Sequence, residues 1–454
     1  GSADVEVIEQ TVPAKAPITP KTRPAERQRV VLPQGLPEER VEIDVPASEK
    51  IAADGTPLER IGEETTVKLG YRAAVFFKKV IVRPKYADPR DASAGVRCAK
   101  LPAQLIEGSL LDASLGANLL VAKYADHLPL YRIEEIYSRA GVAIPRSTLS
   151  DWVIALAAWL KPLHTRMREK LLEQPVIHVD ETVLPLQSVG RTISARAWAY
   201  VARDPKIVLY EFTCDKQGSH VREFLAPWPG GWLQADAASN YDALFAGRPE
   251  IQEVGCWAHA RRKFFDIAAA AEKSGQRVLA HEAVEKIGVL FEIEREGKEL
   301  TPQARKALRE SAARPELLKL RQWLEDRHRE LLPKSPTAGA ISYVLKRWEA
   351  FTRYLDDGRI AIDNNAAERA LREIAVGRKN WLFAGSEKGG EACAIATSLI
   401  ETAKAHGQDP QAYLADILER LPSTLNRDID SLLPMAWEPA ARTAELEKSN
   451  AVKG

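Results

Sequence analysis

The chain has 454 residues, a formal net charge of +1, 45% hydrophobic residues and 28% charged residues. This length suggests roughly two to four domains, and the composition is typical of a globular protein with ample material for a core. The near-neutral charge excludes a globally basic nucleic-acid binder, so any such surface must be local. No apolar run reaches the roughly 18 residues of a membrane helix, and no signal peptide is visible, so we expect a cytoplasmic protein without a membrane span.

The cysteines are far apart in the sequence. They form neither a CxxC motif nor the Cys/His spacing of a zinc site, and we expect them to be reduced, buried thiols. They are Cys98, Cys214, Cys256 and Cys393.

The first hundred residues divide into two parts. Residues 1–40 are rich in Pro and charged residues without apolar periodicity, which predicts a disordered linker or arm. Residues 41–105 carry β signals, with strands expected at Thr65–Leu69 and Ala73–Val82. The second strand is basic and could lie along phosphates, although a solvated strand face explains it equally well. Its candidate phosphate contacts are Lys78 and Lys79.

Residues 106–172 are predicted to contain a helix-turn-helix. Two helices are expected at Leu119–His127 and Leu130–Ala140, and a third, with Ser147 as its N-cap, runs through Leu160. In such a motif the N-terminal end of the last helix reads base edges or phosphates. Because helix pairs around a glycine turn are common, ordinary packing is the alternative. The candidate DNA contacts are Arg146, Ser147, Thr148 and Ser150.

From Gln174 the pattern changes to strands mixed with helices, an α/β class. Three strands, a helix, a strand, a helix and a strand follow in an order that matches a ribonuclease-H-like core. In that core the first and fourth strands are neighbours, so Asp180 and Asp236, which each follow a strand, are expected side by side. The expected strands are Pro175–Val179, Arg196–Val201, Lys206–Phe212, Gly231–Ala235 and Gly255–His259, with a helix at His220–Leu225.

A third acid follows a long helical segment. Residues 267–357 show helical periodicity with mixed charges outside, which indicates a helical insertion with a solvated face. Glu368 then falls in the first turn of the next helix. Asn365 and Glu368 also fit a capping box, so an ordinary helix start is the alternative. Asp242 is a rival acid that we expect to be exposed, and Asp363 a rival that we expect to cap the helix.

Three acids on two strand ends and one helix can bind metal ions. Mg²⁺ prefers oxygen ligands, and two such ions clamp the attacking and leaving oxygens of a phosphoryl displacement. We therefore expect Asp180, Asp236 and Glu368 to hold Mg²⁺ or Mn²⁺, with two ions. A metal-activated water would cut a nucleic-acid strand, and the freed 3′-hydroxyl could attack a second phosphodiester.

Several segments resemble the insertion sequence 66 family of bacterial DDE transposases. They include HVDETVLPL, LQADAASNYDALF, GCWAHARRKFFD and IDNNAAERALREIAVGRKNWLFAGSEKGGEACA, within a match from about residue 60 to 440. The resemblance assigns Asp180 and Asp236 to the two aspartates of the family and Glu368 to its glutamate. It implies a ribonuclease-H-like core interrupted by a helical insertion, a divalent metal, and cutting and joining at element ends.

The matching motifs also contain basic residues and one histidine. Surface ion pairs with Glu373 or Glu368 would explain Arg369 and Arg372 equally well, and His259 could be a core histidine. The residues given DNA-facing or support roles by the resemblance are His259, Arg262, Arg369, Arg372 and Lys379. The candidate DNA contacts of this region are Arg262, Arg372, Arg378 and Lys379.

The N-terminal third departs from the family pattern of a zipper and a cysteine-rich zinc domain. Cys98 stands alone where paired cysteines are expected, and a lone cysteine cannot hold a structural zinc. We predict a β module without structural zinc, and the missing heptads put the usual oligomerisation element in doubt.

The sequence thus predicts a transposase that binds terminal inverted repeats and performs strand cleavage and transfer. The alternatives are a nuclease that stops after the cut and a non-catalytic DNA-binding relic. Expected partners are double-stranded DNA of element ends and target, further copies of the chain on DNA, and small accessory proteins. We expect a bacterial cytoplasmic location, at the nucleoid when acting.

The predicted division has seven parts. They are an arm (1–40), a basic β-rich module (41–105), a helix-turn-helix region (106–172), the first part of the core (173–266), a helical insertion (267–357), the second part of the core (358–405) and a C-terminal helix with a tail (406–454).

Overall fold

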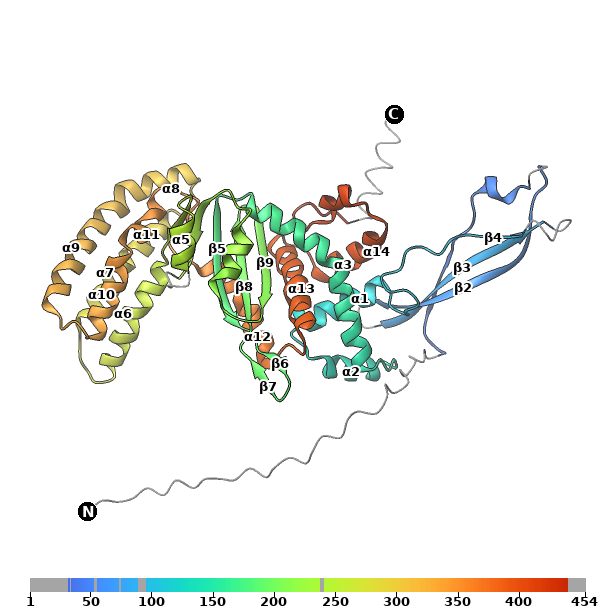
Figure 1. The fold of residues 1–454 in the computed structure, drawn as a ribbon, viewed down its shortest axis with the longest axis horizontal. Helices are drawn as coiled ribbons and strands as arrows, with labels where there is room; N and C mark the ends of the chain where they lie inside the picture. The colour runs from blue at the N-terminus through green and yellow to red at the C-terminus, as the bar shows by residue number, and fades with distance from the viewer. Residues whose placement is uncertain are drawn as a thin grey trace, which may run out of the picture.

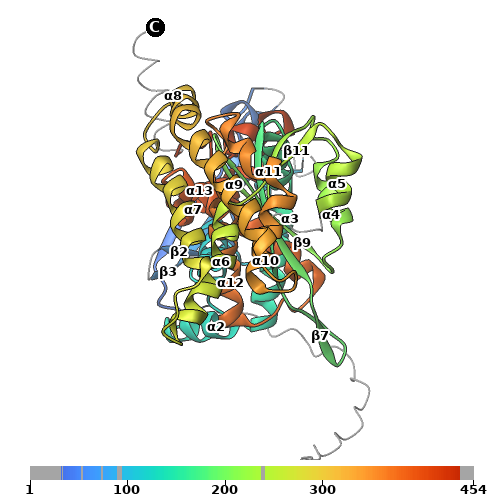
Figure 2. The same ribbon diagram turned by 90° about the vertical axis from the view of Figure 1, so that its left-hand side faces the viewer.

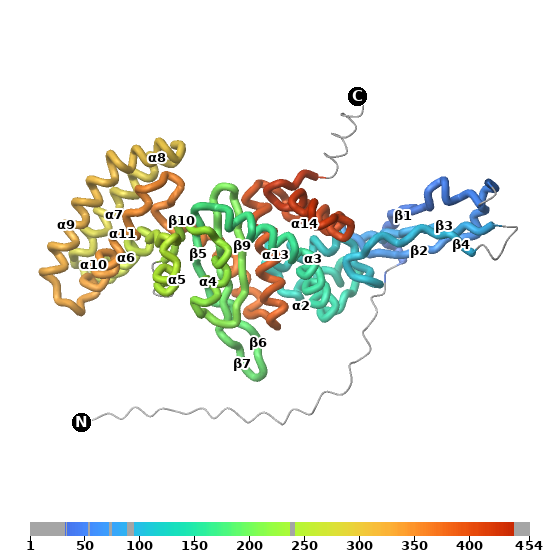
Figure 3. Tube along the Cα trace, turned by 45° about the horizontal axis from the view of Figure 1, so that its top comes forward, coloured from blue at the N-terminus to red at the C-terminus, as the bar shows by residue number. Residues whose placement is uncertain are grey.

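A computed structural model of the protein describes residues 32, 34–52, 55–72, 75–88, 95–236 and 241–439. Most of the predicted N-terminal arm, and the tail beyond residue 439, lie outside these residues. The described chain is elongated. A helical body, a mixed β-sheet, a helical layer and a β-ribbon follow one another along its long axis (Figures 1 and 3).

The central sheet has the strand order β11-β10-β5-β8-β9. Strand β5 pairs antiparallel with β8 and parallel with β10, so the expected adjacency of the first and fourth core strands is confirmed. Strand β9 extends the antiparallel side, and β11 extends the parallel side. The strands are β5 (Val176–Val183), β8 (Arg196–Arg203), β9 (Lys206–Thr213), β10 (Gly231–Gln234) and β11 (Ile251–Val254).

Two strand predictions need correction. Asp180 does not follow its strand but lies within it, opposite Ala199 of β8. The predicted strand Gly255–His259 is wrong, because β11 ends at Val254 and Trp257 begins helix α6 (Trp257–Glu272). Cys256 and Trp257 are fully buried, and a short buried apolar run looks the same in sequence whether it forms a strand or a helix start.

A small hairpin between β5 and β8 was not predicted. Its strands are β6 (Leu186–Ser188) and β7 (Arg191–Ile193), and Leu186 forms a bridge to Ala384. The three-residue strands are too short for a period-2 pattern, so they give little signal in sequence.

Helices cover both faces of the sheet. Helix α12 (Asn365–Trp381) packs on β5 and β8, and the hydroxyl of Tyr210 donates to the Ala370 carbonyl. On the opposite face, Tyr200 stacks on Phe224 of helix α4 (Gly218–Leu225) with ring centroids 3.6 Å apart. The outer layer beyond β9 contains α3 (Arg146–Leu172), α13 (Glu387–Ala405) and α14 (Pro410–Arg420).

The insertion forms a helical body with its own hydrophobic cluster, continuous with the β10–β11 edge. Figure 2 shows its helices in front of the sheet. The buried Arg309 ties it to the chain leading into α12, since the guanidinium binds Glu294 at 2.7 Å and the Ile360 carbonyl at 3.0 Å. With α6, its helices are α7 (Leu279–Glu296), α8 (Pro302–Leu308), α9 (Arg314–Glu330), α10 (Pro336–Lys346) and α11 (Trp348–Thr352).

The N-terminal region combines a β-ribbon with helices. The ribbon projects away from the body (Figure 1) and packs on it through contacts of β2 with α1. Helix α3 begins at Arg146 with Pro145 at its N-cap, so Ser147 is not the cap. Instead, Glu134 accepts a hydrogen bond from the Arg146 amide at 3.0 Å. The elements are β1 (Glu38–Glu42), β2 (Glu59–Arg72), β3 (Val75–Ala87), β4 (Val96–Cys98), α1 (Ala113–Tyr124) and α2 (Leu130–Arg139).

None of the helices in the described part of the chain has the length and apolar character needed to cross a bilayer.

Candidate active site

Half-buried acids gather where β5 and β10 lie side by side. Burial raises the pKa of Asp180 to about 7, and the charges of Asp236, Glu181 and Glu368 act in the same direction. The Glu181 amide opposes this by donating to Asp180 Oδ1 at 2.8 Å. A carboxylate whose pKa is raised by neighbouring acids in this way would be stabilised by a cation.

Glu181 is a fourth acid of the site that sequence reasoning did not assign. Burial and the charge of Asp236 raise its pKa, and the Tyr241 hydroxyl donates to its Oε2 at 3.4 Å. Asp236 follows β10, and its main-chain carbonyl accepts a hydrogen bond from Tyr343 of α10 at 2.6 Å. The insertion therefore contacts the strand end that presents Asp236.

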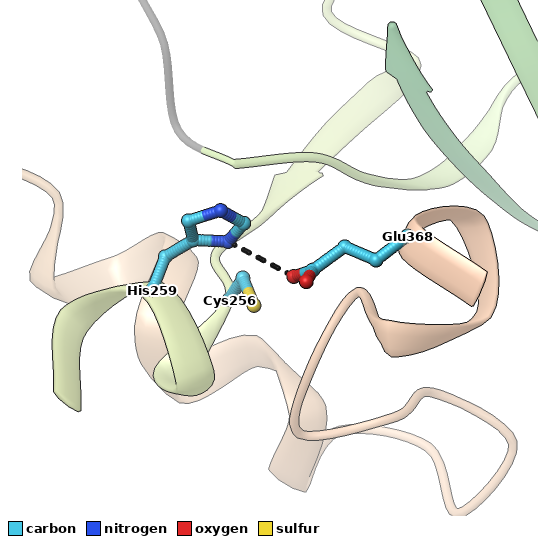
Figure 4. A group of neighbouring side chains, drawn as sticks. All are labelled: Cys256, His259 and Glu368. Carbon is cyan, nitrogen blue, oxygen red and sulfur yellow. Dashed lines mark ion pairs between the residues drawn. The ribbon is translucent and has the colours of Figure 1, made fainter. Parts of the chain in front are cut away.

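Glu368 reaches the site from α12. Its Oε1 lies 3.5 Å from His259 Nδ1, and its Oε2 lies 3.6 Å from Arg262 Nη2, both on α6 (Figure 4). The capping-box alternative is wrong, because Asn364 is the N-cap and Asn365 already lies in the helix. Asp363 is not the N-cap either but precedes it, and its Oδ1 accepts a hydrogen bond from the Asn365 amide at 3.1 Å.

The tightest cluster of potential metal ligands is not the predicted one. One ligand atom each from Cys256, His259 and Glu368 lie within 4.8 Å of one another. No such cluster of Asp180, Asp236 and Glu368 occurs among the described residues. The structure brings these three acids to one end of the sheet, where the charge of Glu368 acts on Asp180, but Glu368 itself is directed at α6.

A buried polar chain joins β5, α12 and α6. Asn364 is fully buried, and its Nδ2 donates to the Val179 carbonyl at 2.9 Å while its amide donates to Cys256 Sγ at 3.2 Å. Its Oδ1 lies 3.1 Å from His178 Nδ1. Burial lowers the pKa of His178 to about 4, so the ring is neutral near pH 7 and Nδ1 donates. This chain fixes the start of α12, and with it Glu368, against the strand that carries Asp180.

The candidate DNA contacts of the helix-turn-helix lie at the start of α3. Arg146 and Ser147 are exposed, and Thr148 and Ser150 are half-buried. A cavity of about 670 Å³ is lined by Arg146, Ser147 and Ser150, but not by Thr148. It continues to the turn between α12 and α13. There the wall of the cavity includes Trp381, at the end of α12, and Leu382 and Phe383, which follow it.

The basic residues of the ribbon already have partners. Lys78 binds Glu38 at 2.9 Å, and Lys79 lies 3.0 Å from Glu419 and 3.3 Å from Asp112. These ion pairs indicate that Lys78 and Lys79 hold the ribbon in place rather than act as free phosphate contacts.

The candidate DNA contacts on α6 and α12 differ in their exposure to solvent. Arg262, Arg372 and Lys379 are exposed, whereas Arg378 is half-buried and donates to the Val183 carbonyl at the end of β5. The proposed ion pairs of Arg369 with glutamates are not seen among the described residues. Instead, Glu373 pairs with His127 at 3.4 Å.

Arg369 lines a separate cavity of about 220 Å³ between α12 and the insertion. Its cationic lining is formed by Arg203, Lys298, Arg305, Arg309 and Arg369.

The comparisons place this architecture among known proteins. Residues 108–392 match the model described as the Transposase IS66 family, and residues 398–435 match the IS66 C-terminal element. Both matches are to parts of transposases, enzymes that move DNA elements. The chain belongs to the IS66 family, as its motifs indicated.

Relatives from Sinorhizobium fredii (strain NBRC 101917 / NGR234) cover most of the chain. The uncharacterized protein y4jD is 35% identical over 427 residues, which are 90% of this chain and 81% of the relative. The uncharacterized protein y4qI is 36% identical over 444 residues, which are 93% of this chain and 79% of the relative.

Proposed function

We propose that this chain is a DNA transposase that binds the terminal inverted repeats of its element, cuts a strand there and joins it to target DNA. The observation that carries the proposal is the state of Asp180, whose pKa is raised to about 7 by burial and by three neighbouring acids. Strongly perturbed carboxyls that lie together are typical of functional sites. The IS66 membership supports DNA as the substrate.

The strand order supports a ribonuclease-H-like core. Its three antiparallel strands β5, β8 and β9, followed by the parallel strands β10 and β11, have the order expected for that fold. Under this proposal residues 173–266 and 358–405 form one catalytic core, interrupted by the insertion 267–357. Arg309 and Tyr343 then hold the insertion against both halves of the core.

Asp180, Asp236 and Glu368 are proposed to hold two Mg²⁺ or Mn²⁺ ions. Carboxylate oxygens are the ligands that these ions prefer, and the raised pKa of Asp180 fits a site that a cation would stabilise. Bound ions would activate water and stabilise the leaving oxygen of a phosphodiester. His259 and Arg262 orient Glu368 from α6, and Tyr343 fixes the strand end that carries Asp236.

DNA is proposed to contact several exposed surfaces around this site. Helices α2 and α3 form the helix-turn-helix, with Arg146, Ser147, Thr148 and Ser150 as its reading end. Arg262, Arg372 and Lys379 would contact phosphates nearer the acids. We propose that Arg378 instead positions the end of β5, since it donates to the Val183 carbonyl. Two element ends require at least two copies on DNA, and small accessory proteins are possible partners.

The test is a cleavage and joining reaction with purified full-length protein. The substrates are a donor DNA with the element ends, a target DNA and Mg²⁺. We expect nicked ends and strand-transfer products from the wild type. Cleavage without joining would support the nuclease alternative, and end binding without cleavage would support the relic.

A matched pair of variants tests whether cleavage depends on the proposed acids. Asp180→Asn should abolish cleavage and leave end binding largely intact, because it removes charge without changing size. The control is Asp242→Asn, which changes an exposed acid paired with Arg347 and should cut normally. Equal cleavage by Asp180→Asn and the wild type would refute the assignment.

A further inference from the structure

Cys256, His259 and Glu368 meet at the start of two helices. Cys256 is the N-cap of α6 and His259 lies in its first turn, so the spacing Cys-x-x-His puts both side chains on one side of the turn. Glu368 faces them from the first turn of α12 (Figure 4). These residues are not explained by the Mg²⁺ proposal alone, because a sulfur and an imidazole are poor ligands for Mg²⁺.

The geometry at the imidazole and carboxylate fits an ion better than a direct hydrogen bond. His259 Nδ1 and Glu368 Oε1 are 3.5 Å apart. Both atoms are shielded from solvent, and neither has a hydrogen-bond partner among the described residues. Tetrahedral Zn²⁺ binds N and O at about 2.0–2.2 Å, which separates two ligand atoms by roughly 3.3–3.5 Å. An ion between the two atoms would be a partner for both. Without it, burying each atom without a partner costs free energy.

The sulfur completes a set of three ligands. Cys256 is fully buried, and its Sγ accepts a hydrogen bond from the Asn364 amide at 3.2 Å. Burial raises the pKa of the Cys256 thiol and the Asn364 amide opposes this, so the thiolate forms only with a bound cation beside it. Amide donors are a common outer layer of metal–thiolate sites. On binding, the thiol proton would leave to solvent and the sulfur would bind as thiolate. Three protein ligands leave a fourth position for water, as in open zinc sites.

We infer that Cys256, His259 and Glu368 form a site for one thiophilic divalent cation, Zn²⁺ in the first place, that is separate in its ligand set from the proposed Mg²⁺ site. The two sites share the Glu368 carboxylate. A Zn²⁺ ion held by Cys256 and His259 therefore takes the Glu368 carboxylate as its third ligand, and this carboxylate is then not available to Mg²⁺. Zn²⁺ binding and Mg²⁺-dependent cleavage then exclude each other, and this second part rests on the proposed function.

Cobalt binding tests the site without any DNA. Co²⁺ replaces Zn²⁺ in such sites and gives a thiolate-to-cobalt charge-transfer absorption when sulfur is a ligand. We expect this band to saturate at one equivalent of Co²⁺ in the full-length wild type and to vanish when Zn²⁺ is added. Absence of the band in the wild type would overturn the inference.

Variants test whether the cobalt absorption band comes from the site formed by Cys256, His259 and Glu368. Cys256→Ser should lose the band, whereas Cys393→Ser should keep it, because Cys393 is also buried but belongs to no group of potential metal ligands among the described residues. A band that survives in Cys256→Ser would contradict the proposal. If circular dichroism shows that Cys256→Ser is unfolded, His259→Asn provides the same test, with an expected loss of Co²⁺ affinity of at least tenfold.

Cleavage assays separate the two parts of the inference. Micromolar Zn²⁺ should inhibit Mg²⁺-dependent cleavage by the wild type and by Cys393→Ser, and should inhibit Cys256→Ser at least tenfold less. If the cobalt band depends on Cys256 but the protein never cuts DNA, the cation site stands and the proposed function fails. If the protein cuts DNA but no cobalt band forms, the function stands and the cation site fails.

Discussion

His259 Nδ1 lies 3.5 Å from Glu368 Oε1, although the two residues are 109 positions apart in the chain. One residue belongs to the helix that leads into the insertion and the other to the helix that follows it. The insertion thus begins and ends at the site, and its first helix sets the direction of the glutamate. Under the proposed function, this contact links the insertion directly to the third acid of the site.

The first prediction concerns His259 as a positioning residue for Glu368. His259→Gln should lower cleavage by about 10–100-fold, because a group that orients a metal ligand is typically worth that much. The loss should be partly rescued by more Mg²⁺, since the variant weakens ion binding rather than end recognition. The measurement is the Mg²⁺ dependence of cleavage together with end binding in a gel-shift assay. A variant with normal Mg²⁺ dependence would contradict the role.

The second prediction follows from the raised pKa of Asp180. Its carboxyl titrates near pH 7 when folded and near about 4 when unfolded, so the folded state holds its proton more tightly. Its contribution to stability is complete below about pH 4 and is lost as the pH rises through about 7. Without metal, the free energy of unfolding should therefore fall between about pH 5 and pH 8.

Burial raises the pKa of Glu211 to about 7 as well. A variant is therefore needed to separate the contribution of Asp180 to the pH dependence from that of other acids. Urea denaturation of Asp180→Asn should show a smaller fall over the same pH range than the wild type. Mg²⁺ at about pH 8 should restore stability to the wild type only. A pH dependence that is identical in the two proteins would argue against a buried Asp180 carboxyl.

The third prediction concerns the buried Asn364. Asn364→Ala removes the donor to the Val179 carbonyl and the acceptor for His178, and should cost about 2–4 kcal/mol of unfolding free energy. The control is Asn380→Ala on the same helix, where the side chain is exposed and the cost should stay within about 0.5 kcal/mol. Urea denaturation measures both. Similar stability of the two variants would refute the structural role of Asn364.

The fourth prediction separates free from paired cations on the DNA surface. Arg146→Ala should weaken end binding and reduce the slope of affinity against salt by about one counterion. Lys79→Ala should leave the slope unchanged, because Lys79 already pairs with Asp112 and Glu419. Binding titrations at several salt concentrations give the slopes. A flat salt dependence of the wild type would count against the whole proposed surface.

Much of the core could be predicted because its sequence signals are local. The apolar runs of β5, β8 and β9 and the acids Asp180 and Asp236 could be recognised in the sequence. The adjacency of β5 and β10 followed from element order alone. The strand predicted at Gly255–His259 failed because burial of Cys256 and Trp257 carries no information about backbone conformation.

The local environment of the site could not be predicted, since it depends on contacts between distant segments. Asn364 reaches Val179 across 185 positions and Cys256 across 108. Glu181 was visible next to Asp180, but only the fold puts it near Asp236. The cysteines were not expected to bind a metal, because one Cys-x-x-His pair at Cys256 does not make a zinc site by itself. That pair becomes a candidate only when the fold brings Glu368 to face it.

The most direct test of the central claim is a joining reaction on purified protein with Mg²⁺, donor ends and a target. The account predicts that the wild type gives strand-transfer products, that Asp180→Asn, Asp236→Asn and Glu368→Gln each give neither cleavage nor joining, and that all three still bind the ends. Wild-type levels of cleavage in any one of the three variants would contradict the account.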